Sequence, residues 1–403
     1  MKHWILSLFL FFFLVEVFSL FPNRSKPLPE ALKVPKVPFV SGLINVHTQF
    51  SDGYGNIPEL ALKAKKYGHS FVIFADLAST EGRRLGLEKS YEGLDAFIEI
   101  ESKTPSGNLL TFFSHTQLAN KPPKELARIA YQHFLGETSI PELFVSISHP
   151  SHIKKPWTQL ERFPDGLEIF NWDALLWRKL QSNPVDFMGI SLMYPLNPFM
   201  ASLRALNPYP KDIGMWDNMN TLGSRHFGIL SSQFERVVHL PLVQASWPTH
   251  EEIFGLGSNI VFLNSPPESD FQLRKKQIYR SIRDAHLAVA YQAIHPFLGN
   301  DFQIVCSSGQ VFRSGDFIPE QLTDCKGQVS VPEDLPYSSK ALVYKDGDVL
   351  HELAIKNAQA TFDLAGRGQY RVEILVRPHS VFWILLRKWI PYVIYNPIFY
   401  RNT

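Results

Sequence analysis

The stretch Asn45–Gly53 reads NVHTQFSDG and follows a short apolar run at residues 39–44. An apolar run that opens into a polar loop predicts a buried strand that delivers side chains at its carboxyl end. Because alternate residues of a strand share a face, we expect Asn45 and His47 to point the same way, with Asp52 folding back from the loop. Histidines at both strand positions would supply two imidazole ligands for a metal ion, but Asn45 takes the first place. The stretch therefore predicts a metal-hydrolase site with at least one ligand replaced.

Short apolar runs alternate with helical segments from residue 41 to about residue 300. Residues 58–67 and 123–135 have helical periodicity, whereas residues 71–74 and 143–148 are strand-like. This alternation predicts an α/β fold of βα units with a largely parallel sheet or barrel, in which the chemistry lies beyond the carboxyl ends of the strands. The polar side chains at such ends are His47, Asp76, Glu101, His149 and Asn171.

These residues, in this order, resemble the PHP (polymerase and histidinol phosphatase) superfamily of metal-dependent phosphoesterases. The family pattern begins His-x-His-Thr-x-x-Ser-Asp-Gly, which residues 45–53 match at every fixed position except the first. Later family elements are a glutamate before a Gly-His-Leu-Leu-like segment, a His-Pro after a strand, and a closing Gly-Ser-Asp-x-His. The corresponding segments here are Glu101 before GNLL at 107–110, SHP at 148–150 and GSRH at 223–226. The resemblance implies a PHP-type distorted (β/α)7 barrel over residues 41–300.

The resemblance also implies which residues would bind the metal ions of the family, of which there are up to three. Leucine cannot bind a metal, and asparagine or serine are weak substitutes for imidazole or carboxylate. The implied centre is therefore a reduced site for divalent zinc or manganese, holding a single ion bridged by Glu101 or no ion. The matching positions are His47, Asp52, Glu101, His149 and His226, and the replaced positions are Asn45, Leu77, Asn108 and Ser224.

Three nearby residues have further expected roles. Glu99 lies two residues before Glu101, on the same expected face, and is an alternative for the retained acid. Arg225 is expected either to bind an anion directly or to pair with Asp52 and Glu101. Asp76 is expected to hold the loop by accepting hydrogen bonds from backbone N–H groups.

The start of the chain predicts export. Residues 1–21 are apolar behind Lys2, which is typical of a signal peptide or of an uncleaved N-terminal membrane anchor. Residues 22–40 contain several prolines and predict an extended linker. Both alternatives place the body of the chain outside the cytoplasm, in the periplasm or cell envelope, with membrane association through the N-terminal segment. The net charge of +2 does not indicate a partner, and the lack of Lys/Arg-rich runs argues against nucleic acid.

A second domain is expected over residues 301–403. Residues 340–345 and 349–355 flank Asp346-Gly347, which is a strong hairpin signal. The spacing of the strands predicts an antiparallel β-sandwich-like domain. The aromatic tail at residues 381–400 is expected to pack across both domains or to form an interfacial membrane helix.

Three other segments carry predictions. Cys306 and Cys325 are expected either to form a disulfide in an oxidising compartment or to be two buried free thiols. Residues 174–222 are irregular and predict a lid or a binding insert. Residues 275–290 are predicted to form one helix.

Two functions are compatible with these patterns. The first is an exported metal-dependent phosphoesterase with a reduced metal site, acting on a phosphorylated small molecule. The second is a catalytically inactive PHP-like binding or scaffolding protein of the cell envelope. Because direct loss of ligands weakens a metal site more than changes around it do, the four replacements favour weakened or absent classical chemistry.

Overall fold

A computed structural model describes the body of the chain between residues 37 and 401, with gaps. The predicted signal segment and residues 22–36 of the predicted linker lie outside the described residues, apart from positions 7 and 10. Most of residues 185–209 and all of residues 378–388 also lie outside them. Within the described part, no helix combines the length and apolar character needed to cross a bilayer. Apart from isolated positions, the described ranges are 37–113, 121–152, 156–159, 162–184, 210–222, 224–233, 238–239, 246–247, 249–377 and 389–401.

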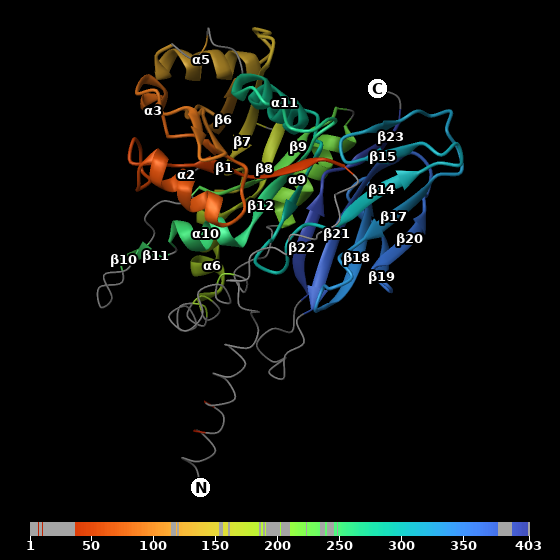
Figure 1. Cartoon of the computed structure of the whole chain (residues 1–403). Helices are drawn as coiled ribbons and strands as arrows, with labels where there is room; N and C mark the ends of the chain where they lie inside the picture. The colour runs from red at the N-terminus through yellow and green to blue at the C-terminus, as the bar shows by residue number, and fades with distance from the viewer. Residues whose placement is uncertain are drawn as a thin grey trace.

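One large mixed sheet forms the centre of the protein (Figure 1). The strands near the predicted site are β1 (Phe39–Val46), β2 (Phe71–Phe74), β4 (Leu94–Ile98), β5 (Ile100–Thr104), β6 (Gly107–Phe113), β7 (Leu143–Ser148), β8 (Gly166–Asn171) and β9 (Phe227–Ser231). The other strands of this sheet are β3 (Lys89–Tyr91), β12 (Ser258–Phe262), β13 (Leu287–Ala290), β16 (Phe317–Ile318), β18 (Ser338–Lys345), β19 (Asp348–Ala354), β21 (Gly368–Arg377), β22 (Ile390–Tyr395) and β23 (Ile398–Tyr400).

The parallel pairs bring several strand ends to one side of the sheet. β1 pairs in parallel with β2 and β9, β2 with β4, β7 with β8, and β8 with β9. A parallel bridge between Leu77 and Glu101 joins the end of β2 to β5. The sheet is mixed rather than largely parallel, because β5, β6 and β7 pair antiparallel and β12 runs antiparallel to β1. The carboxyl ends of β1, β7, β8 and β9 are thereby gathered around one point.

The C-terminal strands continue this sheet. β13 pairs with β22, and β22 pairs with β21, so the described part of the aromatic tail lies between the two groups of strands. This arrangement confirms that the tail packs across both groups, at least over residues 390–400. The hairpin prediction is also confirmed, because β18 and β19 meet at a turn in which Asp346 and Gly347 both have positive φ angles, of 52° and 91°.

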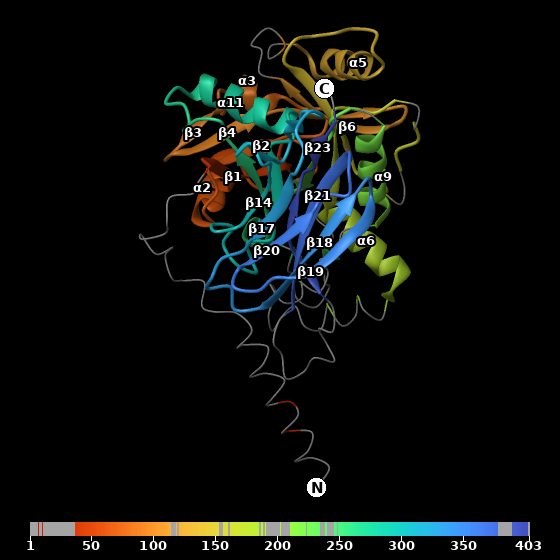
Figure 2. The ribbon, with the colours of Figure 1, turned by 90° about the vertical axis from the view of Figure 1, so that its right-hand side faces the viewer.

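A separate antiparallel sheet of four strands lies beside the C-terminal strands of the mixed sheet (Figure 2). The ring of Phe302 meets that of Tyr395 at a centroid distance of 5.6 Å, which joins the two sheets through one core. Cys306 and Cys325 form a disulfide, as the first alternative predicts, and this indicates an oxidising compartment. The four strands are β15 (Val311–Arg313), β14 (Asp301–Val305), β17 (Lys326–Ser330) and β20 (Gln359–Asp363), and β10 (Val238–His239) and β11 (Ser246–Trp247) form a further short pair.

Two helical predictions require correction. The predicted helix at 275–290 is wrong in its second half, because α11 ends at Arg283, Ala285 turns the backbone with a φ of 55°, and the buried run 287–290 forms β13. The described ends of the predicted irregular insert are helical, as α6 and α9. The helices are α2 (Ile57–Lys66), α3 (Glu81–Arg84), α5 (Pro123–Phe134), α6 (Trp172–Ser182), α9 (Pro210–Thr221), α10 (His250–Leu256) and α11 (Phe271–Arg283).

Candidate functional site

β1 ends in a bulge that turns Asn45 into the protein interior. Asn45 has a φ of 60°, and the register of β1 against β2 shifts between Ile44 and Val46. Asparagine adopts this left-handed conformation more readily than most residues. The buried amide nitrogen of Asn45 lies near four oxygen acceptors: Glu168 Oε1 at 2.8 Å, Ser148 Oγ at 3.2 Å, Glu101 Oε2 at 3.3 Å and Gln233 Oε1 at 3.3 Å.

His47 lies between two carboxylates. Its Nδ1 is 2.5 Å from Asp52 Oδ1, its Nε2 is 2.9 Å from Glu101 Oε2, and the side chain is fully buried. Burial by itself would lower the pKa of His47, but the hydrogen bonds to Asp52 and Glu101 and the charges of both carboxylates raise it to about 10. His47 is therefore an imidazolium at neutral pH, and both ring nitrogens donate hydrogen bonds.

Glu101 is the centre of the network. Asn108 Nδ2 donates to Glu101 Oε1 at 2.6 Å, and His149 Nε2 lies 3.6 Å from the same oxygen. Burial by itself would raise the pKa of Glu101, but the hydrogen bond from His47, the proximity of His149 and the hydrogen bond from Asn108 lower it to about 2. Glu101 is therefore an ionised carboxylate whose two oxygens both accept hydrogen bonds.

The loop after β1 is held by Asp76. Asp76 Oδ1 accepts from the backbone N–H of Thr48 at 2.7 Å and from Ser51 Oγ at 2.6 Å, and its Oδ2 accepts from Thr48 Oγ1 at 2.7 Å. The expectation that Asp76 caps backbone N–H groups of this loop is confirmed. Gly53 packs so closely on the loop that an added Cβ would lie 2.4 Å from the carbonyl carbon of His47. The loop conformation that presents Asp52 to His47 therefore requires glycine at position 53.

Glu168 and Gln233 also belong to the network, although neither was among the expected ligands. Glu168 accepts hydrogen bonds from Asn45, from the backbone N–H of His149 at 2.9 Å and from Asn171 Nδ2 at 2.9 Å. Gln233 Nε2 lies 3.4 Å from His47 Nδ1. Their positions in the sequence could have identified them, because Glu168 lies in a fully buried strand and Gln233 follows the carboxyl end of another.

The structure brings His47, Asp52, Glu101 and His149 together but places His226 elsewhere. His226 precedes β9, at the opposite end of that strand from Ser231, where the network lies. Its Nδ1 is 2.6 Å from the carbonyl oxygen of Pro164, and burial lowers its pKa. Ser224 lies in the same amino-terminal turn, where its carbonyl oxygen accepts a hydrogen bond from Arg401.

The structure contradicts the pairing predicted for Arg225 and the position predicted for Glu99. Arg225 does not pair with Asp52 or Glu101; it donates to Asp284 and to the carbonyl oxygen of Gly315 instead. Glu99 lies in the break between β4 and β5, which turns it away from the network. It pairs with Lys275 of α11 at 2.8 Å and accepts a hydrogen bond from Tyr279 at 2.6 Å.

The insert after β8 approaches the site through α9. Ser151, two residues after His149, donates a hydrogen bond to Asp212 of α9. Burial raises the pKa of Asp212 to about 6, although the hydrogen bond from Ser151 opposes the shift. The carbonyl oxygen of Ser151 also accepts a hydrogen bond from Arg178 of α6 at 2.7 Å. Both described ends of the insert therefore contact the turn that carries His149.

These residues do not fit the divalent metal centre that the resemblance implies. A histidine binds a metal through a free ring nitrogen, whereas both ring nitrogens of His47 already contact carboxylate oxygens, Nδ1 at Asp52 and Nε2 at Glu101. The amide nitrogen of Asn45 occupies the point on which Glu101 and Glu168 converge, and its hydrogens would face a cation. Across the described ranges, no group of three or more His, Cys, Asp or Glu side chains is arranged to hold a metal ion. The network is closed by contacts among its own side chains instead.

Comparisons with known proteins give similarity in structure but not in sequence. No protein-family model matches the sequence, and no curated protein matches it. Among solved structures, the chain is similar to a two-domain protein from Bacteroides vulgatus that is described as containing a predicted PHP-like metal-dependent phosphoesterase. That similarity has a TM-score of 0.38 and 14% sequence identity, and covers 92% of this chain and 100% of the other.

Proposed function

We propose that this chain is an extracytoplasmic PHP-like protein that acts as a binding protein and no longer hydrolyses phosphoesters through a metal centre. In this proposal, residues 41–300 form the PHP-type (β/α)7 barrel and the C-terminal strands its sandwich-like partner. The expected ligand is a phosphorylated small molecule. The disulfide between Cys306 and Cys325 supports the location outside the cytoplasm.

The observation that carries the proposal is the burial of His47 between Asp52 and Glu101, with its two ring nitrogens 2.5 and 2.9 Å from their carboxylate oxygens. In a metal centre, a cation compensates the repulsion between buried carboxylates. Here the imidazolium compensates it, and the amides of Asn45 and Asn108 satisfy the remaining carboxylate oxygens. A divalent ion at this point would have to displace the contacts that His47 makes with both carboxylates and the hydrogen bond from Asn108 to Glu101.

The test is to measure metal content and activity together. We expect protein purified at neutral pH to contain less than one equivalent of metal, and to release no nitrophenolate from 4-nitrophenyl phosphate after addition of Mn²⁺ or Zn²⁺. Stoichiometric metal together with turnover would instead support a reduced-site phosphoesterase. That second candidate is favoured by the meeting of His47, Asp52, Glu101 and His149 in one network.

A restored variant makes the test sharper. The variant combines Asn45→His, Leu77→His, Asn108→His and Gln233→Asp. These changes replace neutral groups around Glu101 by metal ligands. Gln233 is chosen over Ser224 because it contacts Asn45 and His47. We expect this variant to bind zinc in a titration in which the parent protein does not, and the same changes with Ser224→Asp in place of Gln233→Asp to bind it more weakly. Equal zinc binding by parent and restored protein would contradict the proposal.

A further inference from the structure

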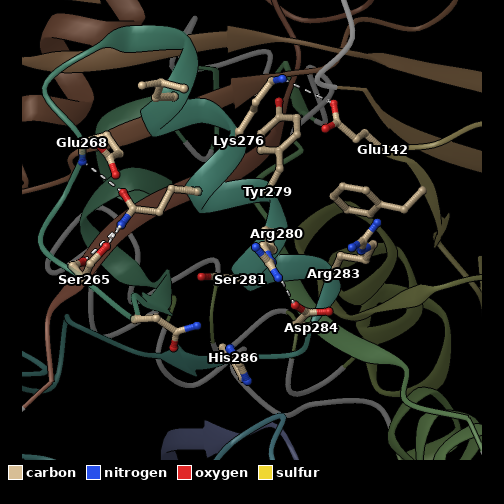
Figure 3. Close-up of a pocket in the computed structure, with 14 residues that line it drawn as sticks. Glu142, Ser265, Glu268, Lys276, Tyr279, Arg280, Ser281, Arg283, Asp284 and His286 are labelled. Atoms are coloured by element: carbon tan, nitrogen blue, oxygen red, sulfur yellow. Dashed lines mark hydrogen bonds and ion pairs between the residues drawn. The ribbon is translucent and has the colours of Figure 1, made fainter.

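A cavity of about 490 Å³ lies at the other end of the sheet from the candidate site. Its walls come from α11, from the turn before β7, from the loop after β12 and from the turn before β13 (Figure 3). Glu142 and His286, which line it, precede β7 and β13, whereas His149 of the candidate site follows β7. The two sites are therefore separated by the length of a strand.

Three cationic side chains of α11 line this cavity. Lys276, Arg280 and Arg283 are spaced by four and three residues, so they lie along one face of the helix. The exposed fractions are 49% for the Lys276 side chain and 79% for that of Arg280. All three are solvent-accessible at the rim and can reach a ligand in the cavity.

These cations are weakly engaged by the protein. Lys276 Nζ is 3.7 Å from Glu142, and Arg280 Nε is 3.9 Å from Asp284, both beyond hydrogen-bond distance. Arg283 makes neither an ion pair nor a hydrogen bond with any part of the chain that the structure describes. Asp284 already accepts a hydrogen bond from Arg225, which leaves Arg280 with only a distant carboxylate.

We propose that this cavity binds a small molecule that carries linked phosphate groups. Lys276 and Arg283 are seven positions apart, which spans about 10 Å along the helix and exceeds a single phosphate but matches a chain of two or three. Guanidinium groups suit phosphate oxygens because they present paired N–H donors. Asn264 and Ser265 line the same cavity and supply neutral polar groups beside the cations. This site is independent of the function proposed above.

Calorimetric titration of the full chain tests the proposal with three probes: tripolyphosphate, orthophosphate and ATP. We expect saturable binding of one tripolyphosphate per chain, orthophosphate binding weaker by about tenfold or more, and weakening by added salt. ATP that binds more tightly than tripolyphosphate would identify a nucleotide as the ligand, and ATP that binds equally would identify the phosphate chain alone; both results support the site. No saturable binding, or equal binding of orthophosphate and tripolyphosphate, would overturn it.

Variants separate this site from general surface charge. Arg280→Gln and Arg283→Gln should each weaken tripolyphosphate binding roughly tenfold, the size expected for one charge-assisted hydrogen bond. Arg128→Gln on α5 is the matched control, because Arg128 is exposed and does not line the cavity, and it should change binding less than about twofold. An unchanged Tm verifies folding in each variant. Equal losses in all three variants would mean that the phosphates bind to surface charge, and the proposal would be wrong.

Discussion

Asn45 occupies a position that requires a hydrogen-bond donor. Its amide nitrogen has two hydrogens, yet four oxygens lie within 3.3 Å of it, the nearest being that of Glu168 at 2.8 Å. Its own Oδ1 has no hydrogen-bond partner in the described part of the chain. Because Glu101 and Glu168 both converge on this point, an additional acceptor there would be repelled.

The variant Asn45→Asp tests this requirement at a single residue. It replaces the donor by a third buried carboxylate, so we expect the free energy of unfolding to fall by about 3–5 kcal/mol near neutral pH. Urea denaturation followed by circular dichroism measures the change. The matched control is Asn56→Asp at the exposed N-cap of α2, which should change stability by less than about 0.5 kcal/mol because Asn and Asp cap helices equally well.

Metal adds a second readout to the same variant. If the network has lost metal binding, Mn²⁺ or Zn²⁺ should not restore the stability of Asn45→Asp. A return to the stability of the parent protein in the presence of either ion would mean that the cluster still accepts a cation. A variant as stable as the parent without added metal would show that the carboxylates do not converge on position 45.

At the scale of elements, His69 connects β1 with α10. Its Nδ1 lies 3.1 Å from Ser41 Oγ of β1, and its Nε2 lies 2.8 Å from the carbonyl oxygen of Phe254 in α10. Burial lowers the pKa of His69 to about 4, although the hydrogen bond to Phe254 opposes the shift. The folded protein therefore keeps this ring neutral in a range where the unfolded chain protonates it.

The pH dependence of stability follows from this difference. Below a pH of about 6.5 the unfolded chain binds a proton at His69 that the folded chain does not bind until about pH 4. The contribution to stability is thus complete above pH 6.5, and about 3 kcal/mol is lost as the pH falls to 4. Unfolding free energies of the parent protein and of His69→Asn, measured across this range, should differ in slope. An unchanged slope in His69→Asn, or the same change in His351→Asn on β19, would contradict the assignment.

Local patterns predicted several elements well because their signals are local. The bounds of β2 and β7 coincide with the apolar runs at 71–74 and 143–148, since fully buried strands are apolar along their whole length. The turn at Asp346-Gly347 was predictable because few residue pairs accept two positive φ angles. The partners of Asp76, Thr48 and Ser51, lie 28 and 25 residues away in the sequence, so only its general capping role was predictable.

The placement of His226 apart from the network has a different origin. The apolar run at 227–231 is preceded by GSRH and followed by a polar segment containing Gln233, so polar groups flank it on both sides. The order of the family motifs favoured the GSRH segment before this run. However, β9 runs parallel to β8, and only the carboxyl end of β9 faces the network. The direction of the neighbouring strands decides which flanking segment contributes side chains to the network. This direction is a property of the tertiary structure, and the spacing of motifs along the sequence does not reveal it. Glu99 failed likewise, because the break between β4 and β5 interrupts the alternation of side chains.

At the scale of the whole molecule, a buried ion pair joins α9 to the C-terminal strands. Arg371 of β21 donates to both carboxylate oxygens of Asp217, at 2.6 and 2.8 Å, and the two side chains are 2% and 5% exposed. The guanidinium also lies 3.6 Å from the ring centroid of Tyr344. Gln369 adds a hydrogen bond of 2.8 Å to the carbonyl oxygen of Asp217. The insert after β8 is therefore anchored on the C-terminal strands as well as on the candidate site.

This anchor and the shared strand β22 predict that both groups of strands unfold together. Asp217→Asn leaves Arg371 buried with one partner fewer, so we expect a loss of about 3 kcal/mol or more in the free energy of unfolding. Asp363→Asn is the matched control, because its ion pair with Lys326 spans 3.5 Å between side chains that are 85% and 69% exposed, and such pairs contribute little.

In urea, tryptophan fluorescence and circular dichroism should report one coincident transition for the parent protein and for both variants, because β22 hydrogen-bonds to β13 and β21 at once. Two separated transitions in the parent protein would mean that the C-terminal strands form an independent unit, and that the contacts of Asp217 stabilise an interface between two folding units rather than one continuous core.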